Sequence, residues 1–323
     1  MSSNCVLSVR NLDTRFQTQA GEIRAVDDVS FDLAKGEILG LVGESGSGKS
    51  VTGFSIMGLI DEPGKIHSGQ IKFKGEDLAN ADSKRYGALR GREIAMIFQD
   101  PMMTLNPLLR IDTQMIEAIL AHESVSKDTA RQRARDALGM VGISSPDERL
   151  RAYPHQFSGG MRQRVVIAIS MLHAPDIIIA DEPTTALDVT IQAQILYEMQ
   201  KLRQNHSVSI IWITHDLSVI SALADRVCVM YAGTLVEQGP IDDVHDYPIH
   251  PYTRGLIQSV PNHNSPGKRL AQIPGVMPTM INPPPGCRFI DRCEHAEDNC
   301  INEPQLISSS NGRQVRCHYP LDI

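Results

Sequence analysis

Long apolar runs and blocks of basic residues are both missing from this sequence of 323 residues. No apolar stretch approaches the roughly 18 residues that a membrane-spanning helix needs, and residues 1–10 lack the basic-then-apolar pattern of a secretory signal. The formal net charge is −7, and no Lys/Arg cluster offers a footprint for a nucleic-acid backbone. We therefore expect no nucleic-acid partner, and a protein that is cytosolic or lies on a membrane without crossing it.

Cysteine is sparse as well: the chain has six, and four of them lie in the C-terminal tail. In a reducing cytosol such a cluster binds metal more often than it forms disulfides. Its wide spacing fits a [4Fe–4S] iron–sulfur cluster better than a zinc site, which prefers closer pairs. We predict such a cluster, with zinc (and His295 or His318 as a ligand) and free thiols as the alternatives. Its ligands would be Cys287, Cys293, Cys300 and Cys317.

What is present is ordinary for a globular chain, with 41% hydrophobic and 21% charged residues. A chain of this length accommodates one large α/β domain and a small appendage. Val29, Phe31 and Leu33 alternate before a Lys-Gly turn, which predicts a strand of an N-terminal antiparallel sheet. Phe16, which precedes this strand, could stack on a nucleotide base or could be an ordinary core residue.

Residues 43–50 read Gly-Glu-Ser-Gly-Ser-Gly-Lys-Ser and fit the phosphate-binding pattern G-x-x-x-x-G-K-[ST]. An apolar strand is predicted just before them, over residues 37–42, and an apolar helix just after them, over residues 51–60. The glycines allow a close backbone approach to phosphate, Lys49 would reach the β/γ-phosphates and Ser50 would hold Mg²⁺. A chance Gly/Ser turn is the alternative, but the strand and helix on either side favour a nucleoside triphosphate site.

Three further predicted strands end in polar residues. Residues 94–99 end at Gln99, residues 177–182 end at Asp181 and Glu182, and residues 209–214 lead to His215. The carboxyl ends of strands are where α/β sheets bind ligands. We expect the first acid to hold Mg²⁺ and the second to polarise a water.

A second anion site is predicted where a helix begins after Phe157. Ser158 can cap that helix, while Gly159 and Gly160 leave N–H groups at the positive end of its dipole. A simple helix cap is the alternative. Residues 112–142, between this site and Gln99, are predicted to be helical and would form a helical insertion.

In their order along the chain, these motifs resemble those of the nucleotide-binding subunit of ATP-binding cassette (ABC) transporters, over about residues 5–255. The signature departs from the common Leu-Ser-Gly-Gly-Gln at Phe157 and Met161 but keeps Ser-Gly-Gly. The matching motifs are Walker A (Gly43 to Ser50), the Q-loop (Gln99), the signature (Phe157 to Met161), Walker B (Ile177 to Asp181), the catalytic Glu182, the D-loop (Ala186 to Asp188) and the switch His215.

The resemblance implies an α/β fold: a P-loop (RecA-like) nucleotide-binding core with an N-terminal antiparallel β subdomain and a helical subdomain at about residues 101–172 of a cassette spanning 1–255. It also implies that Glu182 is the general base and His215 a contact of the γ-phosphate, while Ser50, Gln99 and Asp181 ligate Mg²⁺. Residues expected to bind ATP, some of them across a cassette dimer, are Phe16, Gly43, Ser45, Gly46, Gly48, Lys49, Ser50, Val51, Gln99, Ser158, Gly159, Gly160 and Asp181.

The C-terminal tail carries a narrower resemblance. His250-Pro251-Tyr252-Thr253 and the Pro-rich stretch up to Pro285 resemble the extension of cassettes that serve dipeptide and oligopeptide importers, a group that includes some nickel importers. We therefore predict a cysteine-containing extension over residues 256–323. The predicted function is an ATPase that powers peptide import, with import of nickel or another small solute as the alternative.

A cassette of this kind implies partners. We expect a second cassette, two membrane permease subunits, and a substrate-binding protein that acts indirectly. The altered signature leaves both an identical and a non-identical second cassette open, and we favour the non-identical one. The place would be the cytoplasmic face of the bacterial inner membrane, as a peripheral protein. Met102, Met103, Leu105, Leu108 and Leu109 either line a groove for a permease helix or pack under the helical subdomain. A soluble cassette ATPase acting on nucleic acid or ribosomes is the competing class, but it predicts basic surfaces, long coiled coils or tandem cassettes, which the sequence lacks.

Overall fold

The structure is a computed structural model that describes residues 4–185, 187–259, 272–281, 283, 285–308 and 312–321. Its contacts divide the chain into two compact units. The first unit contains Met1–Ala34, Ile38–Asn80 and Trp212–Ile323, and the second contains Lys35–Glu37 and Ala81–Ile211.

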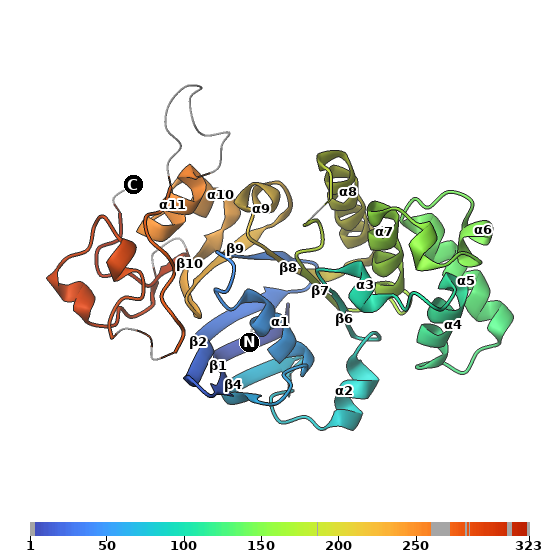
Figure 1. Ribbon diagram of the computed structural model, residues 1–323, viewed down its shortest axis with the longest axis horizontal. Helices are drawn as coiled ribbons and strands as arrows, with labels where there is room; N and C mark the ends of the chain where they lie inside the picture. The colour runs from blue at the N-terminus through green and yellow to red at the C-terminus, as the bar shows by residue number, and fades with distance from the viewer. Residues whose placement is uncertain are drawn as a thin grey trace. The chain divides into compact units, whose positions relative to one another are not determined.

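The N-terminal part of the first unit is an antiparallel sheet, against which helix α1 (Lys49–Met57) lies (Figure 1). Val29, Phe31 and Leu33 are buried on one face of its second strand, so the alternation in the sequence predicted this strand correctly. The strand order is β2-β1-β4-β5, with bounds β1 (Cys5–Thr18), β2 (Gly21–Ala34), β4 (Gly64–Phe73) and β5 (Glu76–Asp77).

The phosphate loop follows a different strand of the same unit, β3 (Ile38–Val42), in which every residue is buried. β3 pairs in parallel with β9 (Arg226–Tyr231), and β9 pairs antiparallel with β10 (Thr234–Pro240). The tail extends this array, because β12 (Gln314–Val315) pairs with β10 and β11 (Ile307–Ser308) pairs with β12. Backbone hydrogen bonds between neighbouring strands therefore connect β3, which precedes the phosphate loop, to the C-terminal tail within one sheet.

Short helices complete the first unit. Helix α1 begins at Lys49 and ends before Gly58, whose φ of 61° closes it, so it is shifted from the predicted residues 51–60. The others are α9 (Leu217–Leu223), α10 (Ile241–Asp246), α11 (Pro251–Gln258) and the 3₁₀ helices η3 (Ile290–Arg292) and η4 (Asp298–Ile301).

The second unit pairs β6 (Ile94–Ile97) in parallel with β7 (Ile177–Asp181), and both strands are fully buried, as their apolar runs predicted. Its helices are α2 (Ser83–Leu89), α3 (Pro101–Thr104), α4 (Ile111–Leu120), α5 (Lys127–Met140), α6 (Pro146–Leu150), η1 (Pro154–Gln156), α7 (Gly159–Ser170) and α8 (Val189–His206) (Figure 1). Strand β8 (Ser209–Thr214) crosses the division between the units.

The predicted helical stretch over residues 112–142 is interrupted. Helix α4 ends at Leu120, and Ser126 begins α5 by accepting a hydrogen bond from the Thr129 N–H at 3.1 Å. Helices α4 and α5 then pack against each other and bury Met115, Ile119 and Leu138. Apolar periodicity showed the buried faces but not the capped turn between them.

None of the helices in the described ranges is long and apolar enough to cross a membrane. The domain limits at residues 255/256 and the helical subdomain at about 101–172 remain predictions. Helix α11 runs through residue 255.

Candidate functional site

The phosphate loop lies in the first unit between β3 and α1. The Lys49 side chain is buried, and its Nζ donates to the carbonyl oxygens of Gly43 at 2.8 Å and Glu44 at 2.9 Å. Ser45 and Gly46 are exposed at the turn of the loop, while Ser50 and Val51 are half-buried at the start of α1. Lys49 thus lies folded against the loop, with its ammonium group near the loop carbonyls.

Glycine is required at two positions of this loop. Gly48 has φ 103°, and a methyl group there would lie 2.3 Å from the carbonyl oxygen of Ala25. Gly43 has φ 156°, and a methyl group there would lie 2.1 Å from the carbonyl oxygen of Met230. Both positions bring the loop backbone against β2 or β9, which leaves no room for a side chain.

Phe16 and His215 belong to the same unit. Phe16 is half-buried on β1, and its ring lies over Gly64, where an added methyl group would lie 2.4 Å from the ring. His215 is exposed just after β8. Stacking of Phe16 on a base and contact of His215 with phosphate remain predictions.

The second unit holds the predicted base and the Q-loop residue close together. The Gln99 Nε2 donates to the Oε2 of Glu182 at 3.3 Å, and the hydroxyl of Thr185 donates to the same oxygen at 2.8 Å. Asp181, at the end of β7, is 4% exposed. Thr185 was missed by the sequence reasoning, since a hydroxyl three residues after an acid is not a signal by itself.

Glu182 has a backbone conformation that an L-residue rarely adopts. Its φ is 45°, in the left-handed region, where the cost to a residue with a side chain is of order 1–2 kcal/mol. Such strain concentrates at functional sites. Together with the bonds from Gln99 and Thr185, it fixes the direction in which the Glu182 carboxylate points.

The predicted second anion site lies at the start of α7. Ser158 is the N-cap and its Oγ accepts from the Met161 N–H at 3.3 Å. Ser158 and Gly159 are exposed, whereas Gly160 is buried and a methyl group there would lie 2.5 Å from the Ile191 side chain. The cap is observed, and binding of phosphate by this helix start remains a prediction.

The structure groups the predicted residues in two sets. The first unit carries Phe16, the phosphate loop and His215, and the second carries Gln99, Ser158–Gly160, Asp181 and Glu182. The joining of the two sets around one nucleotide remains a prediction. The D-loop prediction includes Ala186, which lies outside the described residues.

The iron–sulfur prediction for the tail is wrong. In the ranges the structure covers, no group of three or more His, Cys, Asp or Glu side chains is arranged to hold a metal ion. Burial raises the pKa of Cys317 to about 11 and also raises those of Cys287 and Cys293. None of the four tail cysteines, Cys300 included, is in a disulfide. The spacing of the cysteines in the sequence did not show whether their sulfur atoms lie close enough together to bind a metal. The zinc alternative fails for the same reason, because no metal-binding group is found in the described ranges.

The apolar residues after Gln99 do not behave as one group. Leu105 is buried at 1% exposure, whereas Met103 and Leu108 are 79% and 82% exposed. Helix α3 starts at Pro101, capped by the side chain of Asp100. Part of this stretch packs inward and part faces outward from the second unit.

Two parts of the chain match known protein families. Residues 26–185 match the ABC transporter family, and residues 236–300 match the family described as the oligopeptide/dipeptide transporter C-terminal region. Two solved cassettes are similar in structure: the bacterial ABC transporter cassette MJ0796 (TM-score 0.65, 27% identity, 73% of this chain and 98% of that one) and cbiO1 of Clostridium perfringens (TM-score 0.66, 25% identity, 76% and 92%).

Relatives match over nearly the whole chain. The oligopeptide transport ATP-binding protein AppD of Bacillus subtilis is 50% identical over 97% of this chain and 96% of its own length. The dipeptide transport ATP-binding proteins DppD of Bacillus subtilis and Escherichia coli are 53% and 47% identical, over 97% and 98% of this chain and 94% and 97% of their own lengths.

Fold and phosphate loop thus define an ATP-binding-cassette ATPase, and the chain belongs to the ABC transporter family. Within it, the chain is a member of the oligopeptide/dipeptide transporter ATP-binding proteins. Membership of this family implies that the chain uses ATP with Mg²⁺ and works with a partner ATPase and membrane permeases.

Proposed function

We propose that this chain hydrolyses ATP to power the import of dipeptides or oligopeptides, paired with a second, non-identical cassette on two permease subunits. One observation carries the proposal: identity of about half to ATP-binding proteins of peptide transport extends through the C-terminal region as well as the cassette. The chain would lie peripherally on the cytoplasmic face of the bacterial inner membrane and would meet a substrate-binding protein only through the permeases.

The residues present fit the nucleotide. The loop from Gly43 to Gly48 is a cradle that side chains would fill, and Lys49 supplies a buried ammonium group at its floor. The N–H groups of the loop and the start of α1 would bind the phosphates, with Ser45, Gly46, Ser50 and Val51 contributing. Phe16 would stack on the adenine from β1.

The donor set also fits Mg²⁺. Ser50, Gln99 and Asp181 offer a hydroxyl, an amide and a carboxylate oxygen, the hard ligands that Mg²⁺ prefers. When bound, the ion would neutralise charge on the β- and γ-phosphates.

The chain's own residues then divide the chemistry. Glu182, oriented by Gln99 and Thr185, would accept the proton of the attacking water. His215 would donate a hydrogen bond to the γ-phosphate. Ser158, Gly159 and Gly160 of each cassette would close on the nucleotide held by the other, so that ATP joins the pair and hydrolysis releases it.

Isolation of the tagged chain from native membranes tests the proposal. We expect two integral permeases and a second cassette to co-purify, and the complex to hydrolyse ATP faster when peptides and their binding protein are supplied. Stimulation by nickel in place of peptide would favour the alternative cargo. Co-purification with ribosomes or nucleic acid instead of membrane subunits would contradict the proposed role in transport.

A further inference from the structure

The tail of the chain contacts the phosphate loop at Glu44, a residue that the phosphate-binding pattern leaves unspecified. Both carboxylate oxygens of Glu44 accept from Arg292, with Nη1 to Oε2 at 3.0 Å and Nη2 to Oε1 at 3.1 Å. The two residues are 248 positions apart in the sequence and lie in the same unit. A bidentate pair of this kind fixes orientation as well as charge.

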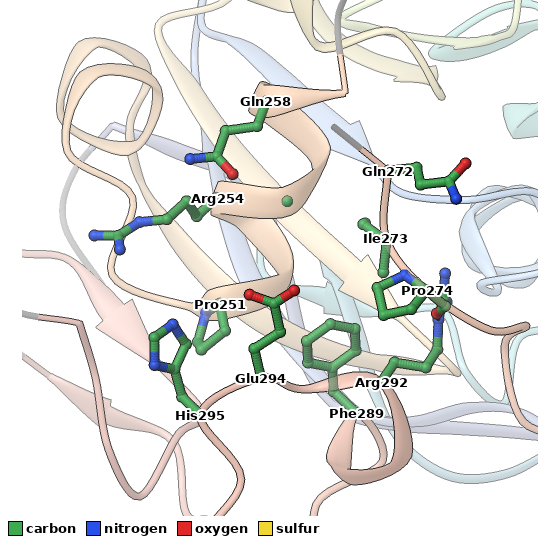
Figure 2. A pocket seen from close by; sticks show the side chains of 11 residues that line it. Pro251, Arg254, Gln258, Gln272, Ile273, Pro274, Phe289, Arg292, Glu294 and His295 are labelled. Carbon is green, nitrogen blue, oxygen red and sulfur yellow. The ribbon is translucent and has the colours of Figure 1, made fainter. Parts of the chain in front are cut away.

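Arg292 is itself held in place. Its side chain is 6% exposed, its Nε donates to the carbonyl oxygen of Pro274 at 2.7 Å, and its Nη1 also donates to the hydroxyl of Tyr231 at 3.3 Å. Burial lowers the pKa of Arg292, but its bonds to Glu44 and Tyr231 outweigh this and raise it overall, so the guanidinium stays charged. Figure 2 shows Arg292 beside Pro274 at a cavity of about 80 Å³, with Phe289 on the same wall.

Tyr252 holds the backbone of the same loop residue. Its hydroxyl accepts from the Glu44 N–H at 2.9 Å, and its ring is fully buried. The ring packs against Tyr231 and Phe289, with centroids 4.6 and 5.4 Å apart. This aromatic cluster leaves the Tyr252 hydroxyl little freedom to move away from the loop.

A third tail residue lies over the turn of the loop. A methyl group added at Gly46 would meet the Cε of Met277 at 3.2 Å. Glu44 is therefore hydrogen-bonded at three places. Its side chain accepts from Arg292, its N–H donates to Tyr252, and its carbonyl oxygen accepts from Lys49 at 2.9 Å. These bonds restrain the backbone of Glu44, which is the residue from which the rest of the phosphate loop continues.

We propose that Arg292 and Tyr252 are positioning residues for nucleotide binding, which fix Glu44 and neutralise its carboxylate beside the incoming triphosphate. Without Arg292, an unpaired carboxylate would lie in a loop that must receive a polyanion, and repulsion would weaken ATP binding. The inference rests on the proposed function, because it assumes that ATP binds at this loop.

The test measures ATP hydrolysis against ATP concentration for the full chain assembled with its partner cassette and permeases. We expect Arg292→Ala to raise the KM for ATP about tenfold while kcat changes less than about twofold, since a lost charge-assisted bond weakens binding and leaves the base untouched. Arg316→Ala is the matched control. Arg316 is also buried, at 7% exposure, and pairs with Asp28 on β2 at 2.8 Å rather than with a residue of the phosphate loop.

A charge rescue separates positioning from mere folding. Adding Glu44→Gln to Arg292→Ala removes the unpaired charge and should return the KM for ATP to within about threefold of the wild-type value. Equal KM values for Arg292→Ala and Arg316→Ala, or no rescue by Glu44→Gln, would overturn the inference. A wild-type complex that neither binds nor hydrolyses ATP would instead remove the proposed function.

Tyr252→Phe decides the matter if Arg292→Ala does not fold. This variant keeps the ring in its aromatic cluster and loses only the acceptor of the Glu44 N–H. We expect binding of a fluorescent ATP analogue to weaken about threefold, the size of one neutral hydrogen bond. Unchanged affinity would contradict a positioning role for Tyr252.

Discussion

Individual residues carry most of the functional argument, and the sequence indicated many of them. Lys49 and Ser50 follow from the phosphate-binding pattern, and Asp181 and Glu182 follow from a buried strand that ends in two acids. The sequence could not show that Glu182 has a positive φ or that Thr185 binds it. Those features depend on how the chain turns after β7.

The first prediction concerns Glu182. Glu182→Gln keeps the shape of the side chain but cannot accept a proton at neutral pH. ATP binding should persist, while phosphate release should fall at least about a hundredfold, the usual contribution of a general base. Glu117→Gln, an exposed carboxylate on α4, is the control and should retain full activity. Substantial hydrolysis by the Glu182 variant would mean that another residue is the base.

Contacts between distant residues were beyond the sequence reasoning. Arg292 pairs with Glu44 and Arg316 with Asp28, across 248 and 288 positions. No local pattern marks either arginine, because each is specified by a partner on another element. The cysteines show the converse, since their closeness in sequence did not build a metal site in the ranges the structure covers.

Secondary-structure elements were predictable where apolar residues run without interruption. Strands β3, β7 and β8 lie where the sequence placed them, because each is buried along its whole length. The ends of helices depended on caps that compete with periodicity. The turn before Ser126 and the end of α1 at Gly58 are examples.

Helix α11 supplies a prediction about pH. His250 is its N-cap: it is 1% exposed and its Nδ1 accepts from the Tyr252 N–H at 3.0 Å. Burial lowers the pKa of His250 from 6.5 to about 3, and a backbone hydrogen bond with Arg316 only partly opposes this. Below pH 6.5 the His250 imidazole therefore binds a proton in the unfolded chain but stays neutral in the folded chain. The free energy of unfolding falls as the pH drops.

We expect the His250 contribution to lower the free energy of unfolding by about 2 kcal/mol between pH 7 and pH 5. His250→Asn keeps a capping acceptor without a titrating ring, so denaturant unfolding of this variant should lose that part of the pH dependence. His67→Asn, at an exposed position on β4, should behave as the wild type. Identical pH profiles for the His250 variant and the wild type would contradict the account.

The segment around α3 supplies a prediction about coupling. Met103 and Leu108 expose their side chains, and we propose that they receive a permease helix. Met103→Glu and Leu108→Glu should then reduce the peptide imported per ATP hydrolysed in proteoliposomes severalfold, with ATPase activity retained. Met140→Glu, an exposed methionine of α5, is the control. Unchanged coupling in the first two variants would refute the docking role.

At the scale of the whole molecule, the candidate site is divided. The phosphate loop and its tail contacts belong to one unit, and the proposed base Glu182, Gln99 and the Ser-Gly-Gly helix start belong to the other. ABC membership would explain why one chain carries two predicted anion sites over a hundred positions apart. The first would hold its own nucleotide, and the second would close on that of a partner.

Nucleotide-dependent pairing is the most direct test of this account. The Glu182→Gln chain and its companion cassette are mixed with and without ATP, and their association is followed by size-exclusion chromatography with light scattering. The account predicts a complex that forms with ATP, comes apart when ATP is removed, and fails to form with Lys49→Ala. Association that is equally weak or equally strong in the presence and absence of ATP would contradict it.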